Sequence, residues 1–277
     1  MTHKALFASI WFTPICIAAL MGAAVAADVP PALPPMPGGA IPSGYLTPAE
    51  KVDSLVLLPA PPAPGSGAEA RDLEASRRGL ALHDGPRWTL AARDADLFGA
   101  NATATFSCAA GIAIGPQQTP ALDRLLRHTM IDFGFSTYGA KNKYQRARPF
   151  MANGAPTCTP QAEAMLRKDG SYPSGHSAIG YGWALVLAQL LPDRTSVLVA
   201  RGRAFGERRR ICNVHWLSDV EEGRTVAAAT FARLQSAPAF IADLAAARAE
   251  LATSLPSPPA SDCTAEALTL ALDGAPR

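Results

Sequence analysis

The stretch Gly170-Ser171-Tyr172-Pro173-Ser174-Gly175-His176-Ser177 runs directly into the apolar segment 178–191. Pro173 and Gly175 indicate a tight turn, and the apolar segment behind them is long enough for a buried helix. The start of such a helix offers free backbone N–H groups and the positive end of the helix dipole, which favour an anion and phosphate above all. His176 lies at the edge of this turn, where an imidazole can exchange protons with a bound group.

The first 27 residues have the features of a secretory signal peptide. Lys4 provides the basic start, residues 5–20 are mostly apolar, and residues 24–27 (Ala-Val-Ala-Ala) offer small side chains for cleavage just before Asp28. The alternative is an uncleaved membrane anchor, which the short apolar core disfavours. We therefore expect a signal peptide over residues 1–27 and a periplasmic mature protein.

Length, charge and cysteine content limit the class of protein. A chain of 277 residues can bury one sizeable core. Its 25 basic and 23 acidic residues become 24 and 23 once Lys4 leaves with the signal, so neither nucleic acid nor an anionic membrane is expected as a partner. An even number of cysteines then remains in an oxidising compartment, which predicts disulfides and leaves their pairing open. Their spacing is not that of a zinc site, and they are Cys108, Cys158, Cys212 and Cys263.

Composition divides the mature chain into three segments. Residues 28–66 are rich in proline and are expected to form an extended arm that lies on the following domain. Within this arm, Leu55-Val56-Leu57-Leu58 is apolar, which suggests that part of it docks on the core. Residues 67–252 are expected to form one compact domain, and residues 253–277 a tail tethered by Cys263.

Helical periodicity dominates residues 67–252, with no sustained strand-like alternation and no internal repeat. The predicted fold class is therefore all-α, a single compact helical bundle. Helices are expected to begin at Thr119-Pro120, at Thr159-Pro160, after a cap at Asp193, and at the capping box Ser218-Asp219-Val220-Glu221. The expected helices cover residues 69–82, 87–97, 102–114, 119–141, 159–170, 178–191, 193–205, and 218 to beyond 234.

Three blocks concentrate basic and histidine residues: 141–149, the turn 170–177, and 208–219. A phosphoryl group in transfer spreads its charge over three equatorial oxygens, so it needs several converging cationic or N–H donors and in-line groups on both apical sides. Arginines, a lysine, a helix start and two histidines supply such a set. Asp219 follows His215 by four residues, so its carboxylate can fix the tautomer of that ring, as in a catalytic triad.

These blocks resemble the three-part signature of the phosphatidic acid phosphatase type 2 (PAP2) superfamily. Lys-x6-Arg-Pro corresponds to residues 141–149, Pro-Ser-Gly-His to residues 173–176, and Arg-x5-His-x3-Asp to residues 209–219. More closely, the chain resembles the class A bacterial non-specific acid phosphatases over roughly residues 54–234. The shorter shared blocks are residues 54–59, 94–97, 106–108, 156–158 and 215–220.

The chain departs from the signature at Arg208, where the pattern has serine. Three adjacent arginines stand there, and Arg209 is matched only by counting back from His215. The change bears on one hydrogen bond to phosphate, and Arg208 could add charge there instead. Ser177 also stands where close relatives often carry threonine, which is a mild change.

The resemblance implies a helical bundle of the PAP2 and vanadium haloperoxidase type and a phosphatase that acts on small phosphomonoesters. It assigns His215 as the nucleophile that becomes a phosphohistidine, Asp219 as the group that orients it, and His176 as the acid for the leaving alcohol and the base for water. No metal or other cofactor takes part, and a homo-oligomer is expected. The residues implied to hold the phosphate oxygens are Lys141, Arg148, Ser174, Gly175 and Arg209.

Three alternatives stay open at this point. A vanadium-dependent haloperoxidase would hold vanadate with the same residues that are implied to hold phosphate, which we call the phosphate clamp. A lipid phosphatase is disfavoured because the sequence shows no membrane helices. A non-catalytic periplasmic phosphate-binding protein would need the clamp but has no use for two in-line histidines and an aspartate. The basic residues that flank the signature, Lys143, Arg146 and Arg210, are interpreted as solvated surface.

Overall fold

The computed structural model describes residues 1–2, 43–253, 257–258 and 260–271. The predicted signal peptide and the first part of the arm therefore lie outside the described residues. All regular secondary structure in the described ranges is helical, which confirms the all-α class. The helices are α1 (Ser54–Leu57), α2 (Gly67–Leu80), α3 (Pro86–Asp94), η1 (Ala102–Phe106), α4 (Ser107–Ala110), α5 (Pro120–Phe135), α6 (Tyr138–Tyr144), α7 (Pro149–Asn153), η2 (Pro160–Ala162), α8 (Glu163–Leu166), α9 (Gly175–Leu190), η3 (Pro192–Arg194), α10 (Thr195–Ile211), α11 (Leu217–Leu234), α12 (Pro238–Leu251) and α13 (Ala260–Ala271).

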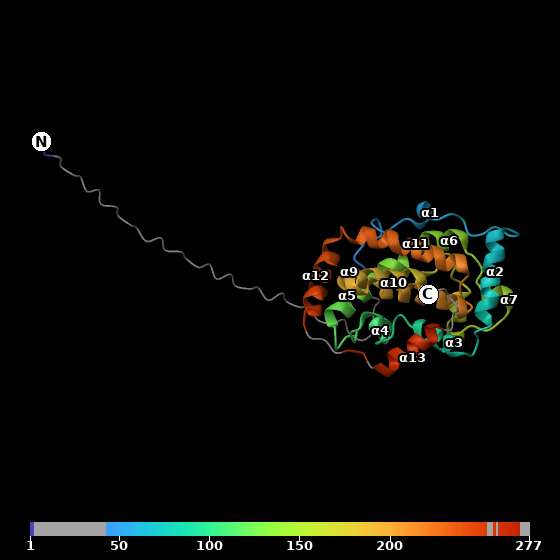
Figure 1. Ribbon diagram of the computed structural model, residues 1–277. Helices are drawn as coiled ribbons and strands as arrows, with labels where there is room; N and C mark the ends of the chain where they lie inside the picture. The colour runs from blue at the N-terminus through green and yellow to red at the C-terminus, as the bar shows by residue number, and fades with distance from the viewer. Residues whose placement is uncertain (3–42, 254–256, 259, 272–277) are drawn as a thin grey trace.

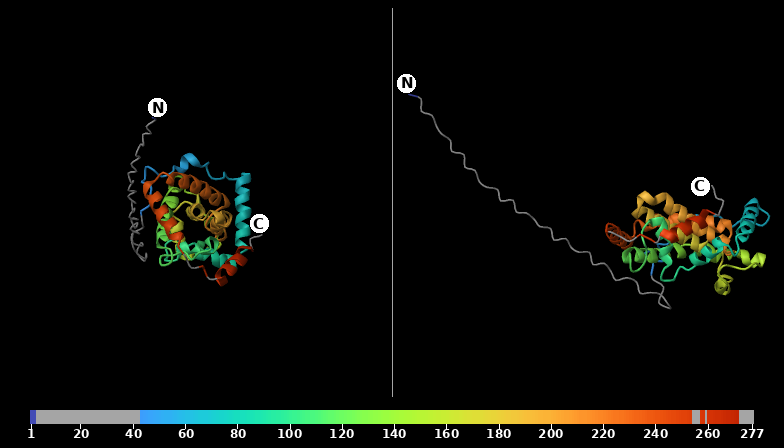
Figure 2. Two further views of the ribbon diagram at one scale, coloured as in Figure 1. Left: turned by 60° about the vertical axis from the view of Figure 1, so that its left-hand side comes forward. Right: turned by 60° about the horizontal axis from the view of Figure 1, so that its bottom comes forward.

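Helix α9, the apolar segment behind the glycine turn, is the centre of the bundle. It packs against α10, α11 and α5, and these helices surround it in Figure 1 and in the left view of Figure 2. Trp183 of α9 is fully buried, and its indole N–H donates to the carbonyl oxygen of Leu126 at 2.7 Å. Burial of each large apolar side chain contributes roughly 1.5–3 kcal/mol, so this contact surface is the main source of stability. No helix among those described is long and apolar enough to cross a membrane.

Small residues allow α9 and α10 to approach closely. A Cβ atom on Gly202 of α10 would lie 2.6 Å from the Cβ of Ala184 and 3.0 Å from the carbonyl oxygen of Gly180. No larger residue fits between the two backbones without moving one of them. The close contact holds the end of α10, which carries three arginines, beside the start of α9.

Several predicted helix boundaries are wrong: the helix expected over residues 102–114 ends at Ala110, and the one expected over residues 193–205 runs to Ile211. In two further cases local hydrogen bonds end or shift the helix. The helix expected over residues 119–141 ends at Phe135, since Thr137 turns the chain by donating both its N–H and its hydroxyl to the carbonyl of Gly134. Lys141 therefore lies on the separate helix α6. The capping box expected from Ser218 begins two residues earlier, where the N–H of Trp216 donates to Oδ2 of Asp219 at 2.9 Å.

The structure does not use two other residues that were predicted as helix caps, Asp193 and Gly170. Asp193 lies inside the short helix η3, and α10 starts after it at Thr195 without a side-chain cap. The segment opened by Thr159-Pro160 ends at Leu166 rather than at Gly170. Helix α11 ends at Leu234, because a new helix begins at Pro238.

The proline-rich arm and the tail are both fastened to the bundle. Leu58 of the arm is buried beside Tyr172 and Val226, whereas Leu55 and Val56 are exposed. Leu46 of the arm is also buried in the main core, and its N–H donates to Oδ1 of Asp132 at 3.0 Å, so the arm docks at both places. The disulfide Cys108–Cys263 joins α4 to α13, and Cys158–Cys212 joins the segment before η2 to the end of α10. The prediction of disulfides among the four cysteines is thus confirmed.

Candidate active site

The three sequence blocks meet at one end of α9, held by backbone hydrogen bonds. The N–H of Ser174 donates to the carbonyl of Asp219 at 2.9 Å, and the N–H of Ser171 donates to the carbonyl of Arg146 at 2.9 Å. Ser174 also caps α9, since its hydroxyl oxygen accepts the N–H of Ser177 at 3.2 Å. The N–H of His215 donates to the carbonyl of Arg209 at 3.2 Å. The predicted site residues therefore come together in space.

His215 and Asp219 form a buried pair on the loop before α11 and its first turn. Nδ1 of His215 lies 3.3 Å from Oδ2 of Asp219, and both residues are at most 2% exposed. Nε2 of His215 lies 3.1 Å from Nη1 of Arg148. When Asp219 accepts a hydrogen bond from the N–H of Nδ1, the lone pair on Nε2 points toward the cationic cluster, where an anion would bind.

Burial, and then the neighbouring cations, favour the neutral form of both histidine rings. Burial lowers the pKa of His215 well below its usual value, and Arg148, Lys141 and Arg209 lower it further. Burial and the neighbouring Arg209 likewise lower the pKa of His176, whose Nε2 lies 3.0 Å from the carbonyl oxygen of Ala95. A neutral imidazole is the form that can attack an electrophile.

Three cations surround the histidines, and two of them already have a carboxylate partner. Oδ2 of Asp169 lies 3.2 Å from Nζ of Lys141 and 2.8 Å from Nη2 of Arg148. Lys141 also donates to the carbonyl of Gly170 at 2.5 Å. Burial and then the charge of Arg148 lower the pKa of Lys141 to about 8. Asp169, 27% exposed at its side chain, was not among the predicted site residues, and no motif pointed to it.

Arg209 is the third cation, and its guanidinium is not saturated. The residue is 2% exposed, and its Nε and Nη1 atoms have no hydrogen-bond partner within the described part of the chain. Burial, together with the charge of Arg148, lowers the pKa of Arg209 to about 9. Because buried polar groups are nearly always hydrogen-bonded, these two nitrogen donors fit an anion supplied from outside.

Arg146 is not the solvated surface residue that was predicted. Its Nη1 donates to Oδ1 of Asp219 at 2.7 Å and to the hydroxyl of Ser218 at 2.8 Å. Its Nη2 donates to Oδ2 of Asp72 on α2 at 2.7 Å, and its side chain is 13% exposed. The periodicity of α2 gave no sign that Asp72 would turn inward, so the sequence missed this pair.

The other two basic residues that flank the signature, Lys143 and Arg210, differ in exposure. Lys143 is exposed, as expected, whereas Arg210 is partly buried and donates to Glu207 at 3.2 Å and to the carbonyl of Ala75 at 2.6 Å. Arg208, which replaces the serine of the signature, is fully buried and forms an ion pair with Asp94. Its guanidinium is thus directed at Asp94 of α3, a carboxylate that it shares with Arg201.

Comparison with known proteins agrees with this arrangement. The sequence pattern of the PAP2 superfamily matches residues 126–239, from α5 into the start of α12. The chain is 45% identical to a non-specific acid phosphatase of Salmonella typhimurium over 208 residues, which are 75% of this chain and 83% of the relative. The chain belongs to the PAP2 superfamily.

Two further relatives of the PAP2 chain point the same way. It is 40% identical over 209 residues to a non-specific acid phosphatase of Providencia stuartii, covering 75% of the chain and 84% of the relative. It is 38% identical over 199 residues to an acid phosphatase of Zymomonas mobilis, covering 72% and 75%. The resemblance to the class A bacterial non-specific acid phosphatases is therefore confirmed. In the described residues of this PAP2 chain, no group of three or more His, Cys, Asp or Glu side chains could hold a metal ion.

Proposed function

We propose that the protein is an acid phosphatase that hydrolyses small phosphomonoesters through a phosphohistidine on His215. The observation that carries the proposal is the buried guanidinium of Arg209, whose Nε and Nη1 have no hydrogen-bond partner among the described residues, in the same cluster as the paired His215 and Asp219, with Nδ1 3.3 Å from Oδ2. The names of the curated relatives support phosphatase chemistry over the haloperoxidase and binding-protein alternatives.

Binding of the phosphate group uses the cationic cluster and the start of α9. Arg209 supplies Nε and Nη1, which have no partner within the described part of the chain, and Lys141 and Arg148 supply charge. The turn at Ser174-Gly175 supplies backbone N–H groups with the helix dipole behind them. These donors converge on the charge that develops on the equatorial oxygens, which is the term that most lowers the barrier to phosphoryl transfer.

Transfer then proceeds in two balanced steps. Nε2 of His215 attacks phosphorus, the N–P bond forms, the P–O bond to the alcohol breaks, and His176 gives its proton to the departing oxygen. A water molecule next attacks phosphorus, His176 takes one of its protons, and the N–P bond breaks to release inorganic phosphate. The bound phosphate opposes the charge of Arg209 and so favours the protonated form of His176 that the first step needs.

Trapping the intermediate tests the proposal. Purified mature protein should hydrolyse p-nitrophenyl phosphate equally well before and after exhaustive chelation, because the clamp consists of cations and backbone amides. Rapid quenching in alkali, which preserves phosphohistidine, followed by peptide mapping should place phosphate on the peptide that holds His215. Phosphate on the peptide with Ser174 and His176 would reverse the two roles, and activity that returns only with added metal would refute the proposal.

The cellular setting belongs to the same proposal. The basic start, the apolar segment and the small residues before Asp28 support export to the periplasm, and the two disulfides suit an oxidising compartment. Amino-terminal sequencing of the secreted protein should begin at Asp28. A homo-oligomer stays a prediction, which sedimentation of the mature protein would test.

A further inference from the structure

Asp94 is a buried carboxylate that stands outside the signature and next to the group that holds His176. It is the last residue of α3 and is 1% exposed. The following residue, Ala95, contributes the carbonyl oxygen that lies 3.0 Å from Nε2 of His176. A shift of the backbone at Asp94 would therefore move the acceptor that orients the catalytic ring.

Two buried arginines of α10 hold the carboxylate of Asp94. Nη2 of Arg201 donates to its two oxygens at 3.3 and 3.0 Å, and Arg208 forms an ion pair with Oδ2. Arg208 directly precedes Arg209 in the last turn of α10, so the same carboxylate also restrains the backbone that carries the unsaturated phosphate-binding arginine. Two buried guanidinium groups thus share the carboxylate of Asp94, and loss of one member of a buried ion pair is strongly destabilising.

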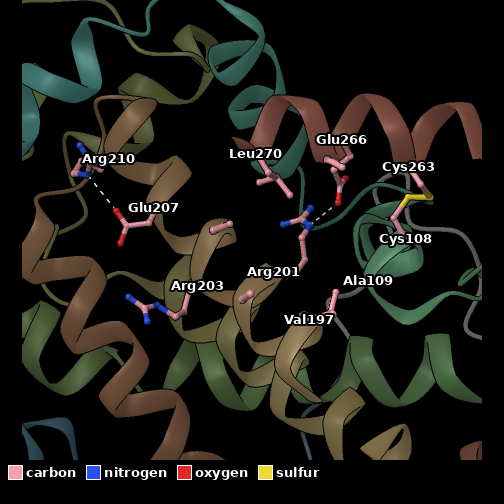
Figure 3. Close-up of a pocket in the computed structure, with 13 residues that line it drawn as sticks. Cys108, Ala109, Val197, Arg201, Arg203, Glu207, Arg210, Cys263, Glu266 and Leu270 are labelled. Carbon is pink, nitrogen blue, oxygen red and sulfur yellow. Dashed lines mark hydrogen bonds and ion pairs between the residues drawn. A yellow bond between two sulfur atoms is a disulfide. The ribbon is translucent and has the colours of Figure 1, made fainter. Parts of the chain in front are cut away.

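Glu266 of the C-terminal helix α13 supplies a second carboxylate. Its Oε1 accepts from Nε of Arg201 at 2.9 Å and its Oε2 accepts from Nη2 of Arg93 at 2.8 Å. Figure 3 shows Arg201 reaching from α10 toward Glu266 at one side of a cavity of about 730 Å³, with the disulfide Cys108–Cys263 beside them. The tail thus completes a charge network that ends at the active site.

We propose that Asp94 is a positioning residue for His176 and Arg209, and that α13 supports it through Glu266. The inference rests on the proposed function, because it assigns a support to the acid of that reaction. Asp94 acts only by keeping Ala95 and Arg208 in place. A misplacement of a catalytic group by about 1 Å costs on the order of 10²-fold in rate, so a loosened network should reach the chemistry.

The variants Asp94→Asn and Glu266→Gln remove each carboxylate with little change in shape. Glu207→Gln is the matched control, because Glu207 lines the same cavity but pairs with Arg210 and Arg224, each at 3.2 Å. The measurement is the ratio of kcat/KM for an alkyl phosphate to that for p-nitrophenyl phosphate. Only the alkyl substrate needs a proton from His176, so a merely structural loss would leave this ratio unchanged.

We expect Glu266→Gln to lower the ratio by about 3–10-fold, Asp94→Asn to lower it by about 10–100-fold, and Glu207→Gln to leave it unchanged. An unchanged ratio in folded Glu266→Gln and Asp94→Asn would overturn the inference while the wild-type protein remains an active phosphatase. A wild-type protein that hydrolyses neither ester would instead overturn the proposed function itself. If Asp94→Asn does not fold, the ratio for Glu266→Gln decides alone.

Discussion

Replacing Arg146 by glutamine is expected to weaken the dyad of His215 and Asp219 without touching the phosphate clamp. Asp219 is fully buried, and burial raises the pKa of its carboxyl, whereas the guanidinium of Arg146 and the N–H of Trp216 lower it. Without the positive charge, the carboxyl becomes harder to ionise. A protonated Asp219 is a weaker acceptor for the N–H of Nδ1 and no longer stabilises positive charge on the ring, so Nε2 of His215 loses nucleophilicity.

The contacts of Arg146 set the expected size of the effect. Its Nη1 lies 2.7 Å from Oδ1 of Asp219 with the side chain 13% exposed, and hydrogen bonds to a charged group are worth about 1.5–3 kcal/mol when partly buried. Since about 1.4 kcal/mol corresponds to tenfold, kcat/KM should fall by roughly 10–150-fold. A raised carboxyl pKa means that activity is lost as pH falls through a higher value, so the acid limb of the pH profile should move toward neutral pH.

The assay is kcat/KM for p-nitrophenyl phosphate from about pH 4 to about pH 9. Lys143→Gln is the matched control, because it removes an exposed charge from the same segment. Arg146→Lys should recover part of the rate, since it keeps the charge but loses the second donor to Asp72. A folded Arg146→Gln variant with an unmoved acid limb and an unchanged rate would refute the reasoning.

Three other outcomes are expected. His176→Ala should cost about 10²–10⁴-fold with alkyl phosphates and far less with p-nitrophenyl phosphate, and equal losses would exclude His176 as the acid. Vanadate should inhibit competitively as a transition-state mimic, and rapid bromide oxidation by the vanadate-loaded protein with poor ester hydrolysis would favour the haloperoxidase alternative. Cys158–Cys212 closes a separation of 54 residues, so its reduction should lower the free energy of unfolding by about 4 kcal/mol. Because Cys212 precedes His215 by three residues, activity should fall as well. Thermal melts with and without reductant measure the loss of stability.

The sequence predicted the fold class, and the three blocks that it singled out meet at one end of α9, because both features depend on local patterns. The apolar segment after the glycine turn is long and lacks charge, and it became the central helix α9. Helix ends were harder, since each depends on one or two hydrogen bonds. The hydroxyl of Thr137 ends α5 before α6 begins, and no periodicity reports such a contact in advance.

The carboxylates that pair with the arginines of the signature region could not be predicted from local patterns. Asp72, Asp94 and Asp169 lie far from one another in the chain, and each pairs with an arginine of the signature region. Charge pairing over such separations is decided by the fold, and a single sequence offers no spacing that encodes it. Arg146 was misjudged for this reason, because a basic residue beside a motif is most often solvated.

Asp169 shows what these pairings mean for binding. Its carboxylate lies 3.2 Å from Nζ of Lys141 and 2.8 Å from Nη2 of Arg148, so these two cations share one carboxylate. Arg209 differs from these two cations, because its Nε and Nη1 atoms have no hydrogen-bond partner among the described residues and can therefore donate to an anion. An incoming phosphate is therefore expected to bind first to Arg209 and the start of α9. It must then share Lys141 and Arg148 with Asp169, which limits affinity for the product and favours its release.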